Sequence, residues 1–372
     1  ADSVRKTEKS DGADAVVPME PKCYCDPCAR GSREPRKTAR TGNFRGSRGC
    51  RLRDRAALFR MPRSHVFFRP AERPKVNLFL YFLTVIIWGT TWIAIKLQLG
   101  VVAIPVSIFY RFALAGLVLF AALLLTRKLQ RMDRRGHLLC LGQGLCLFCL
   151  NFLCFYTATQ WIPSGLVSVV FSAATLWNAL NARLWFGTRI APRVMVAGVV
   201  GFSGLVLLFW PELAGQQASH ETLLGLGFAL LGTFCFSTGN MLSSLQQRAG
   251  LRPLTGNAYS MLYGAAVLLA GCLIAGVPFR FDTSTAYVGA LVYLAIPGSV
   301  IGFTAYLTLV GRMGPARAAY CTVLFPVVAL SVSTFAEGYQ WTPAALLGLA
   351  LVMFGNLLVF TKWTPFARRA VA

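Results

Sequence analysis

The most regular feature of the chain is a series of apolar runs separated by short, basic connections. Each run is roughly twenty residues long, enough for an α-helix to cross a hydrocarbon core about 30 Å thick. The ten runs cover residues 77–96, 103–126, 137–159, 164–185, 193–210, 223–245, 255–277, 286–309, 315–335 and 343–361. The pattern predicts an all-α membrane protein with ten transmembrane helices and excludes a soluble enzyme.

Composition and charge indicate how the chain is oriented in the membrane. The 372 residues are 55% hydrophobic, and 37 Lys and Arg stand against 14 Asp and Glu. Beyond position 75 the cations other than Arg111 lie at the ends of the runs, where the positive-inside rule places them, so we expect no nucleic-acid partner. The connections on one side carry most of them, whereas the opposite connections carry Lys96 and Arg280. We therefore expect a multi-pass protein of the plasma membrane, the bacterial inner membrane, with both termini in the cytoplasm.

The first 75 residues differ from the rest of the chain. They combine Arg, Gly, Ser, Pro and Ala without a long apolar stretch, which predicts a disordered basic segment and no secretory signal peptide. Cys23, Cys25 and Cys28 would hold zinc only with a fourth ligand, so we interpret them as incidental. We also raise the hypothesis that the natural start is Met61, directly before the first run.

The runs divide into two halves of five, 76–210 and 223–361, followed by a cytoplasmic tail at 362–372. The halves match weakly at an offset of about 150 residues, with Tyr156 opposite Tyr306. Because five is odd, the second half enters the membrane from the opposite side, which gives an inverted repeat. Such repeats are typical of transporters, whose solute path runs between the halves near the midplane.

Several short motifs resemble a known family. They are the stretch 88–92 (Trp-Gly-Thr-Thr-Trp) in the first run, Arg111 in the second, Pro326 in the ninth, Glu337 after it, and glycine-rich fifth and tenth runs. In this order they resemble the EamA family of the drug/metabolite transporter superfamily, over about three quarters of the chain. The resemblance implies a permease for small metabolites.

The same resemblance implies what such a permease carries. Members of the family move amino acids, amines or nucleoside-like compounds, usually outward, through a central cavity between the halves. This chain departs from the pattern, because Gly187 and Leu176 take the positions that match Glu337 and Pro326. Any role of the latter two residues is therefore confined to the second half.

Arg111 is the most informative single residue. It lies about eight residues inside the second run, or ~12 Å along a helix. Charges at such depth are costly and usually face the bundle interior or a wet cavity. Arg111 therefore either binds a substrate carboxylate or phosphate, or braces helix-end carbonyls, and its depth leaves room for partial snorkelling to the outer surface. The matching residue of the second half is Tyr259, so an anion contact would be asymmetric.

Uncharged polar and aromatic side chains recur at helical spacing in several runs. Ser237 and Asn240 belong to a polar stripe on the sixth, which either lines the path or makes interhelical hydrogen bonds; we favour the path because Asn240 needs several partners. Tyr306 and Tyr320 equally fit ordinary packing. The residues predicted to contact the substrate are Trp88, Thr91, Trp92, Arg111, Asn151, Tyr156, Asn178, Asn181, Ser237, Asn240, Tyr306 and Tyr320.

The mechanism is less constrained than the fold. Proton coupling normally needs a carboxylate or His along the path, and Glu337 is the only such candidate, so we favour facilitated diffusion or exchange. An enzyme would need a convergent catalytic set, which the centres of the runs lack. A receptor would not explain the repeat, whereas a channel can share its lining with a carrier. We expect no cofactor and no metal.

Small residues in the runs predict close helix packing. Gly198, Gly201 and Gly204 in the fifth run, and Gly348 and Gly355 in the tenth, have spacings that allow backbones to approach closely. We interpret them as packing positions, and they are equally compatible with a homodimer. The cysteines of the apolar runs are expected to pack as small hydrophobic residues.

Overall fold

The computed structural model describes residues 74–210, 220–319 and 321–360. The segment predicted to be disordered lies outside these ranges apart from its last two residues, and so do the cysteine cluster at 23–28 and Met61. Tyr320 and the predicted tail at 362–372 also lie outside them. Within the described ranges every regular element is a helix.

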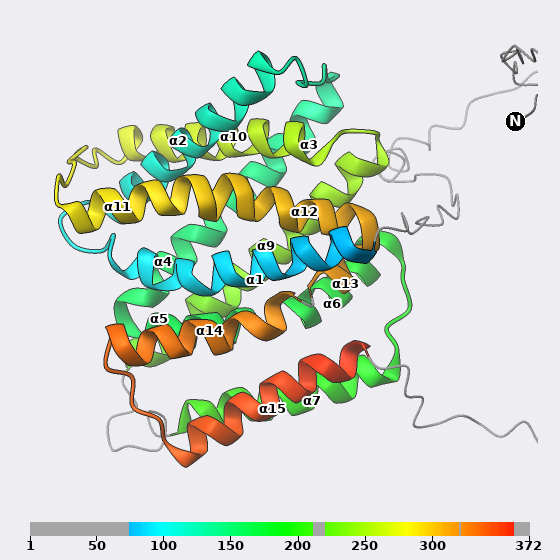
Figure 1. The fold of residues 1–372 in the computed structure, drawn as a ribbon, viewed down its shortest axis with the longest axis vertical. Coiled ribbons are helices and arrows are strands. Elements are labelled where there is room, and N and C mark those ends of the chain that lie inside the picture. Colours follow the sequence, from blue (N-terminus) through cyan, green and yellow to red (C-terminus); the bar gives the residue numbers. More distant parts are fainter. Residues whose placement is uncertain (1–73, 211–219, 320, 361–372) are drawn as a thin grey trace, which may run out of the picture. The chain divides into compact units, whose positions relative to one another are not determined.

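The helices follow the predicted apolar runs, with ends that differ by a few residues (Figure 1). Several predicted runs consist of two or three consecutive helical segments. In chain order the elements are α1 (Pro74–Lys96), α2 (Ile104–Leu125), α3 (Arg134–Gln143), η2 (Gly144–Leu150), α4 (Asn151–Trp161), α5 (Ser164–Phe171), α6 (Ala174–Phe186), α7 (Pro192–Leu208), α9 (His220–Arg248), α10 (Pro253–Ile274), α11 (Thr285–Tyr293), η3 (Leu294–Ile301), α12 (Gly302–Met313), α13 (Pro315–Ala318), α14 (Cys321–Ala336) and α15 (Pro343–Phe360).

Length and composition allow seven helical stretches to cross a membrane. They are Lys75–Lys96, Ile104–Leu125, Arg134–Trp161, Ser164–Phe186, His220–Arg248, Pro253–Ile274 and Thr285–Met313. Three further apolar helices, Pro192–Leu208, Leu324–Ala336 and Pro343–Leu358, are shorter. The prediction of an all-helical membrane protein is confirmed, while the full set of ten spans in two inverted halves stays a prediction.

Two π-helical segments interrupt the third and eighth predicted runs, and the apolar pattern gives no sign of them. In η2 the Asn151 backbone N–H donates to the Cys146 carbonyl, and in η3 the Gly302 N–H donates to Pro297, each five residues back. Such a turn inserts one extra residue and leaves a neighbouring carbonyl free for another donor. The segments occupy the same place in the two predicted halves.

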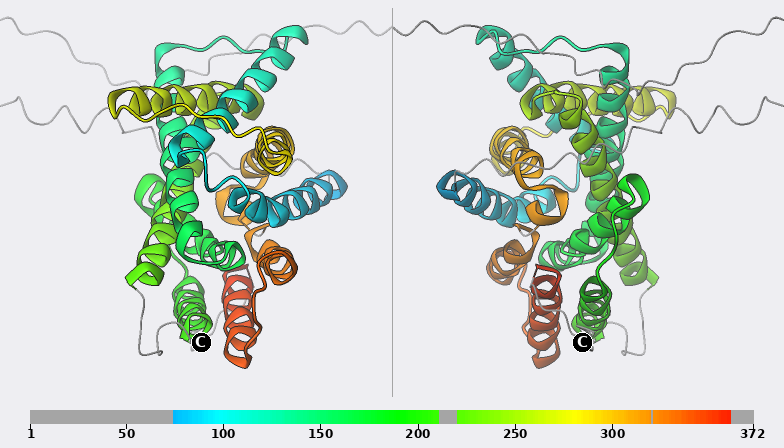
Figure 2. Two further views of the ribbon diagram at one scale, coloured as in Figure 1. Left: turned by 90° about the vertical axis from the view of Figure 1, so that its left-hand side faces the viewer. Right: turned by 90° about the vertical axis from the view of Figure 1, so that its right-hand side faces the viewer.

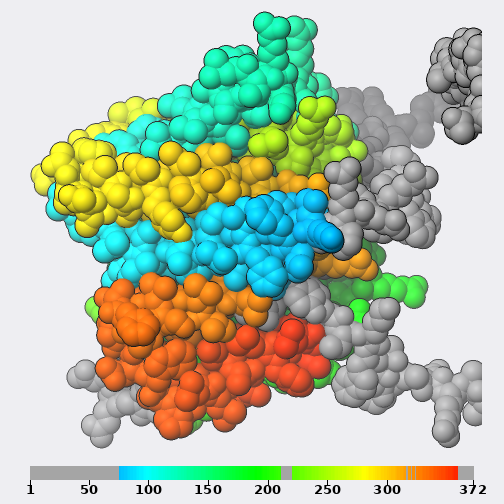
Figure 3. Space-filling view, viewed as in Figure 1, coloured from blue at the N-terminus to red at the C-terminus, as the bar shows by residue number. Residues whose placement is uncertain are grey.

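Helices of the two predicted halves pack against one another. α1 lies between α12 and α14, α2 lies along α10, α4 along α9, and α7 along α15. Figure 1 shows α1 in this central position, and the side views of Figure 2 show α7 beside α15. The space-filling view shows the side chains of α1 in contact with those of α12 and α14 (Figure 3). The interior between the halves is thereby enclosed by helices of both.

The contact between α7 and α15 depends on glycine, as the spacing predicts. A Cβ added at Gly204 would lie 2.7 Å from the Gly348 carbonyl oxygen and from the Val352 nitrogen. A Cβ at Gly348 would meet the Gly204 carbonyl oxygen at the same distance. These atoms are backbone and cannot move aside without separating the helices. A Cβ at Gly201, one turn away, has nothing within 4 Å.

The difference between Gly204 and Gly201 generates a prediction on stability. We expect Gly204→Ala to lower the free energy of unfolding by about 1–3 kcal/mol, because the added methyl group overpacks a backbone contact. Gly201→Ala on the same helix is the matched control and should be neutral or slightly stabilising, since alanine favours helix. Denaturant unfolding of both variants in detergent micelles measures the difference. Equal stabilities would contradict the observed approach of α7 and α15.

Candidate functional site

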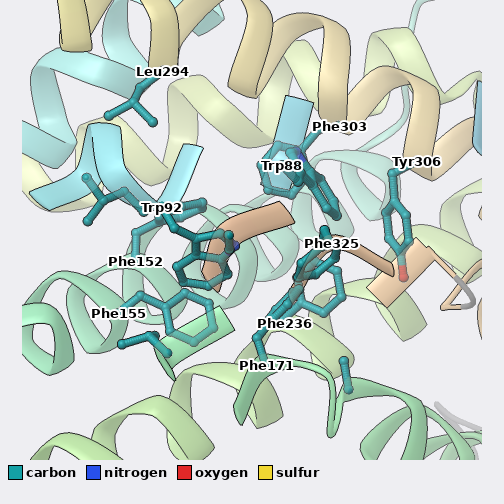
Figure 4. Packing of buried hydrophobic residues seen from close by; sticks show 14 of the residues in the cluster. Trp88, Trp92, Phe152, Phe155, Phe171, Phe236, Leu294, Phe303, Tyr306 and Phe325 are labelled. Carbon is teal, nitrogen blue, oxygen red and sulfur yellow. The ribbon is translucent and has the colours of Figure 1, made fainter. Parts of the chain in front are cut away.

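A group of aromatic rings fills the centre between the two predicted halves. Trp88 of α1 lies 4.9 Å from both Phe303 and Tyr306 of α12, measured between ring centroids. Trp92, one turn further along α1, lies 5.2 Å from Phe155 of α4. Figure 4 shows these rings converging with others from α5, α9 and α14. Because flat rings leave gaps where their edges meet, such a group can enclose a space for an apolar solute.

A small cavity lies among these rings, with a volume of about 30 Å³. By the volume that a buried water requires, it holds about two waters, far below the hundreds of cubic ångströms of a typical small-ligand site. The cavity is therefore closed in this conformation, and a metabolite enters only if the helices separate. Its lining comes from both predicted halves: Trp88, Thr91, Trp92, Ile95, Arg111, Asn151, Phe152, Phe155, Phe171, Phe236, Phe303 and Phe325.

Among the described residues of this lining Arg111 of α2 is the only charged one, and it is 2% exposed. Its Nε donates to the Ser299 hydroxyl at 3.1 Å, and the guanidinium lies close to the Tyr156 side chain. The guanidinium carbon lies 4.3 Å from the centroid of Phe152, within the range of a cation–π contact. Its burial rules out the snorkelling that the sequence left open.

The residues around Arg111 supply hydrogen-bond partners for only part of its guanidinium group. Within the described residues no carboxylate pairs with it, and its buried Nη1 has no hydrogen-bond partner. A buried charge without a counter-ion is strongly unfavourable, and an anion that enters the cavity would relieve this cost. Of the two roles predicted for Arg111, the contact with Ser299 supplies bracing, while the free Nη1 fits the binding of an anion.

The π-helical segment η3 positions this arginine. The Ser299 hydroxyl donates to the Leu294 carbonyl five residues earlier, at 2.8 Å, and accepts the bond from Arg111. The preceding residue, Gly298, accepts a 3.1 Å hydrogen bond from Trp88 Nε1. A Cβ at Gly302 would lie 2.6 Å from the same indole nitrogen, so glycine is required for α1 to approach. The segment η3 therefore accepts hydrogen bonds from two residues of the first half, Arg111 and Trp88.

A set of hydrogen-bonded polar side chains, here called the asparagine network, lies beside the rings. Asn240 of α9 donates to the Asn178 side-chain oxygen at 3.2 Å and to the Tyr306 hydroxyl at 3.1 Å. Asn181 of α6 donates to the Ser237 hydroxyl at 2.8 Å. All five side chains are buried, and none of them is among the cavity lining. Their contacts correspond to the interhelical hydrogen bonds that were the alternative to a lining role, and the Tyr306 ring joins the network to the cavity.

The remaining predicted residues fall into three places. Thr91 and Trp92 line the cavity, whereas Tyr156 lies behind Arg111 and donates to the Gln98 side-chain oxygen at 2.6 Å. Glu337 lies apart from both groups, between α14 and α5. Its carboxylate accepts from the Ser164 backbone N–H at 3.2 Å and from the hydroxyls of Ser164 and Ser333. Tyr320 lies outside the described residues.

Sequence reasoning missed most of the aromatic lining. Phenylalanine is common in membrane helices, and nothing in its spacing separates a cavity position from a lipid-facing one. The missed lining residues are Ile95, Phe152, Phe155, Phe171, Phe236, Phe303 and Phe325. Ser299 and Gln98 were also missed, although a serine after Pro297 in an apolar run is a weak signal that sequence reasoning could have used.

Known proteins of the same organisation share this arrangement of helices. Residues 76–210 and 223–361 each match the EamA-like transporter family. The chain belongs to this family. A solved crystal structure with 20% sequence identity has the same fold, with a TM-score of 0.59 over 77% of this chain and 96% of its own.

Several relatives of this EamA-like chain carry descriptive names. The "Uncharacterized inner membrane transporter YedA" of Escherichia coli K12 is 29% identical, over 75% of this chain and 88% of its own. The "Probable amino-acid metabolite efflux pump" of the same strain is 25% identical, over 74% and 92%. The "Probable terminal-alkyne amino-acid exporter" of Streptantibioticus cattleyicolor is 27% identical, over 74% and 91%.

Membership of the EamA-like family makes the chain a membrane transporter, which confirms the predicted family and function class. It also implies a small-molecule substrate and a lipid environment. The aromatic cavity with its single cation is the part of this transporter whose chemistry suits a solute.

The incomplete satisfaction of Arg111 generates a prediction on stability. We expect Arg111→Met to unfold at the same temperature as the wild type or above it in detergent, because an apolar side chain of similar length removes a buried charge without a counter-ion. If bracing through Ser299 were the main role, the variant would lose this contact and its cation–π pair, and its melting temperature would fall by several degrees. Differential scanning fluorimetry distinguishes the two results.

Proposed function

We propose that the chain exports small carboxylate-bearing metabolites, amino acids foremost, by alternating access. The observation that carries this proposal is the buried Arg111, whose Nη1 has no partner in a cavity enclosed by both halves. A substrate carboxylate matches the paired N–H donors of a guanidinium. The aromatic walls suit an apolar side chain. Two relatives are named for the efflux or export of amino acids or their metabolites, which supports the same class.

We propose ten transmembrane spans in two inverted repeats of five. The separate family matches over 76–210 and 223–361 support the repeat, as do the π-helical segments at matching places. Of the three shorter helices, α7 has 17 residues and α15 has 18, near the lower limit for crossing the hydrocarbon core, and α14 has 16 and follows directly on α13. The cations of the connections support a topology with both termini in the cytoplasm, and the names of relatives support the inner membrane of a bacterium.

The contacts between helices suggest which parts move. The cavity is too small for an amino acid, so α1, α4 and α5 must separate from α9, α12 and α14 on one side at a time. We propose that the asparagine network and Tyr156, which adjoin the cavity without lining it, rearrange during the cycle, and Tyr320 stays a sequence-based prediction for this path.

We propose transport rather than catalysis because the family and its named relatives are transporters. A channel-like facilitator is the alternative, and saturable counterflow separates it from a carrier. Amines without a carboxylate are poorer candidates, since their charge would meet that of Arg111. The homodimer stays a prediction: Gly204 and Gly348 face each other within the chain, so the dimer would need another surface.

Flux measurement in proteoliposomes tests the proposal. A labelled panel of amino acids, amines, nucleosides and organic anions is offered to wild-type protein and to Arg111→Met. We expect saturable counterflow of amino acids that falls at least tenfold in the variant, while the amide of the same amino acid, which lacks the carboxylate, is not carried. Transport of amines or nucleosides alone, or equal flux in the variant, would contradict the proposed role of Arg111.

Glu337 provides a separate prediction. It links α14 to the first turn of α5, that is, one half to the other, at the end that topology places outside. We expect Glu337→Gln to change counterflow several-fold at every pH gradient, because a glutamine offers one acceptor oxygen where the carboxylate offers two. Ser333→Ala removes one of the donors to the Glu337 carboxylate. It should change counterflow in the same direction as Glu337→Gln, but by a smaller factor.

The alternative role of Glu337, proton coupling, predicts a different pattern. A coupled carrier would show wild-type flux driven by a pH gradient, and Glu337→Gln would abolish that drive while downhill exchange continued. This result would show that Glu337 acts in proton coupling and not as a link between the two halves.

A further inference from the structure

Three buried polar atoms of the residues that line the cavity have no hydrogen-bond partner within the described part of the chain. They are Nη1 of Arg111, Nε1 of Trp92 and Oδ1 of Asn151. The first two are donors and the third is an acceptor. A solute that satisfies all three must carry a group that accepts hydrogen bonds and a separate group that donates one.

Asn151 is held in place by the π-helical turn that precedes it. Its backbone N–H donates to Cys146, five residues back, so the Leu147 carbonyl loses its usual helical partner. The Asn151 side chain replaces that partner, with Nδ2 donating to the Leu147 oxygen at 3.0 Å. This bond fixes which end of the amide is engaged. Oδ1 has no partner among the described residues, and Asn151, which is 1% exposed, belongs to the cavity lining, so Oδ1 is the amide atom that a donor on a solute can engage.

The matching place in the second half has no such group. Ile301 occupies it, at the same offset that relates the two π-helical segments. Within the described lining Asn151 is the only amide, and Thr91 is the only other uncharged side chain with an oxygen. The Thr91 hydroxyl already donates to the Trp88 carbonyl at 2.9 Å. A donor on the solute therefore finds its best acceptor at Asn151.

We propose that Asn151 is the specificity residue that recognises the ammonium group of an α-amino acid, while Arg111 and Trp92 take its carboxylate. The proposal rests on the proposed function, transport through this cavity. It deepens that function by assigning discrimination between amino acids and the same acids without an amino group. An acid that lacks the ammonium leaves Oδ1 buried without a donor, and a desolvated acceptor without a partner is unfavourable.

Competition in proteoliposomes tests this inference. Uptake of labelled phenylalanine is measured against unlabelled phenylalanine and against 3-phenylpropanoate, which has the same ring and carboxylate without the amine. We expect the wild type to prefer phenylalanine by about tenfold or more. In Asn151→Leu, which keeps the branched shape of the side chain and removes the acceptor, this preference should fall to about threefold or less while competition by phenylpropanoate persists.

Asn356→Leu is the matched control. Asn356 of α15 is also buried and makes the same local bond, with Nδ2 donating to the Val352 carbonyl four residues back at 3.1 Å, but it does not line the cavity. Its replacement should leave the ratio of the two inhibition constants unchanged, whatever it does to stability.

The outcomes separate the two proposals. A folded Asn151→Leu protein with the wild-type preference would overturn the role of Asn151, and so would a wild type that accepts both acids equally; either result leaves carboxylate transport intact. Absence of flux for both acids in folded wild type would instead overturn the proposed function. Should Asn151→Leu fail to fold, the wild-type preference and the variant Asn151→Ala still decide whether Asn151 recognises the ammonium group.

Discussion

A cation buried without a counter-ion is the constraint around which the centre of this protein is organised. Arg111 is held by the Ser299 hydroxyl and the faces of phenylalanine rings, with Tyr156 nearby, and none of these groups neutralises its charge. Such a state is tolerable in a membrane only if the side chain serves a function that requires it. The aromatic walls exclude lipid and most water from the guanidinium, which strengthens its attraction for an anion that enters.

The scaffold is repeated, but its chemistry is not. Matching π-helical segments and reciprocal helix pairs relate the two halves, whereas Arg111, Asn151 and Glu337 each have an uncharged or apolar counterpart in Tyr259, Ile301 and Gly187. A repeated scaffold supplies two similar conformations of comparable energy, as alternating access requires. In the proposed site the asymmetric side chains give an orientation, in which one end of a solute meets the cation and the other the amide.

Sequence reasoning predicted the helices because apolar runs bounded by cations have few other solutions in a bilayer. It found Arg111, Trp88, Trp92 and Asn151 because charge, indole and amide groups are costly in lipid and stand out. It did not find the π-turns, since their composition is that of any apolar helix, nor the phenylalanines of the lining. Asn178, Asn181 and Asn240 were predicted to lie on the path from their residue type. The structure engages them in interhelical hydrogen bonds outside the cavity lining, where Asn178 Nδ2 and Asn240 Oδ1 have no partner among the described residues.

Ligand-induced stabilisation of the purified protein tests the central claim most directly. The melting temperature is measured in detergent for the wild type with increasing leucine or phenylalanine, and with the corresponding amides. If a substrate carboxylate neutralises Arg111, the amino acids raise the melting temperature in a saturable manner, as binding to the folded state requires, and the amides do not. Equal stabilisation by acid and amide would show that the cation is not the anchor of the solute and would contradict the account.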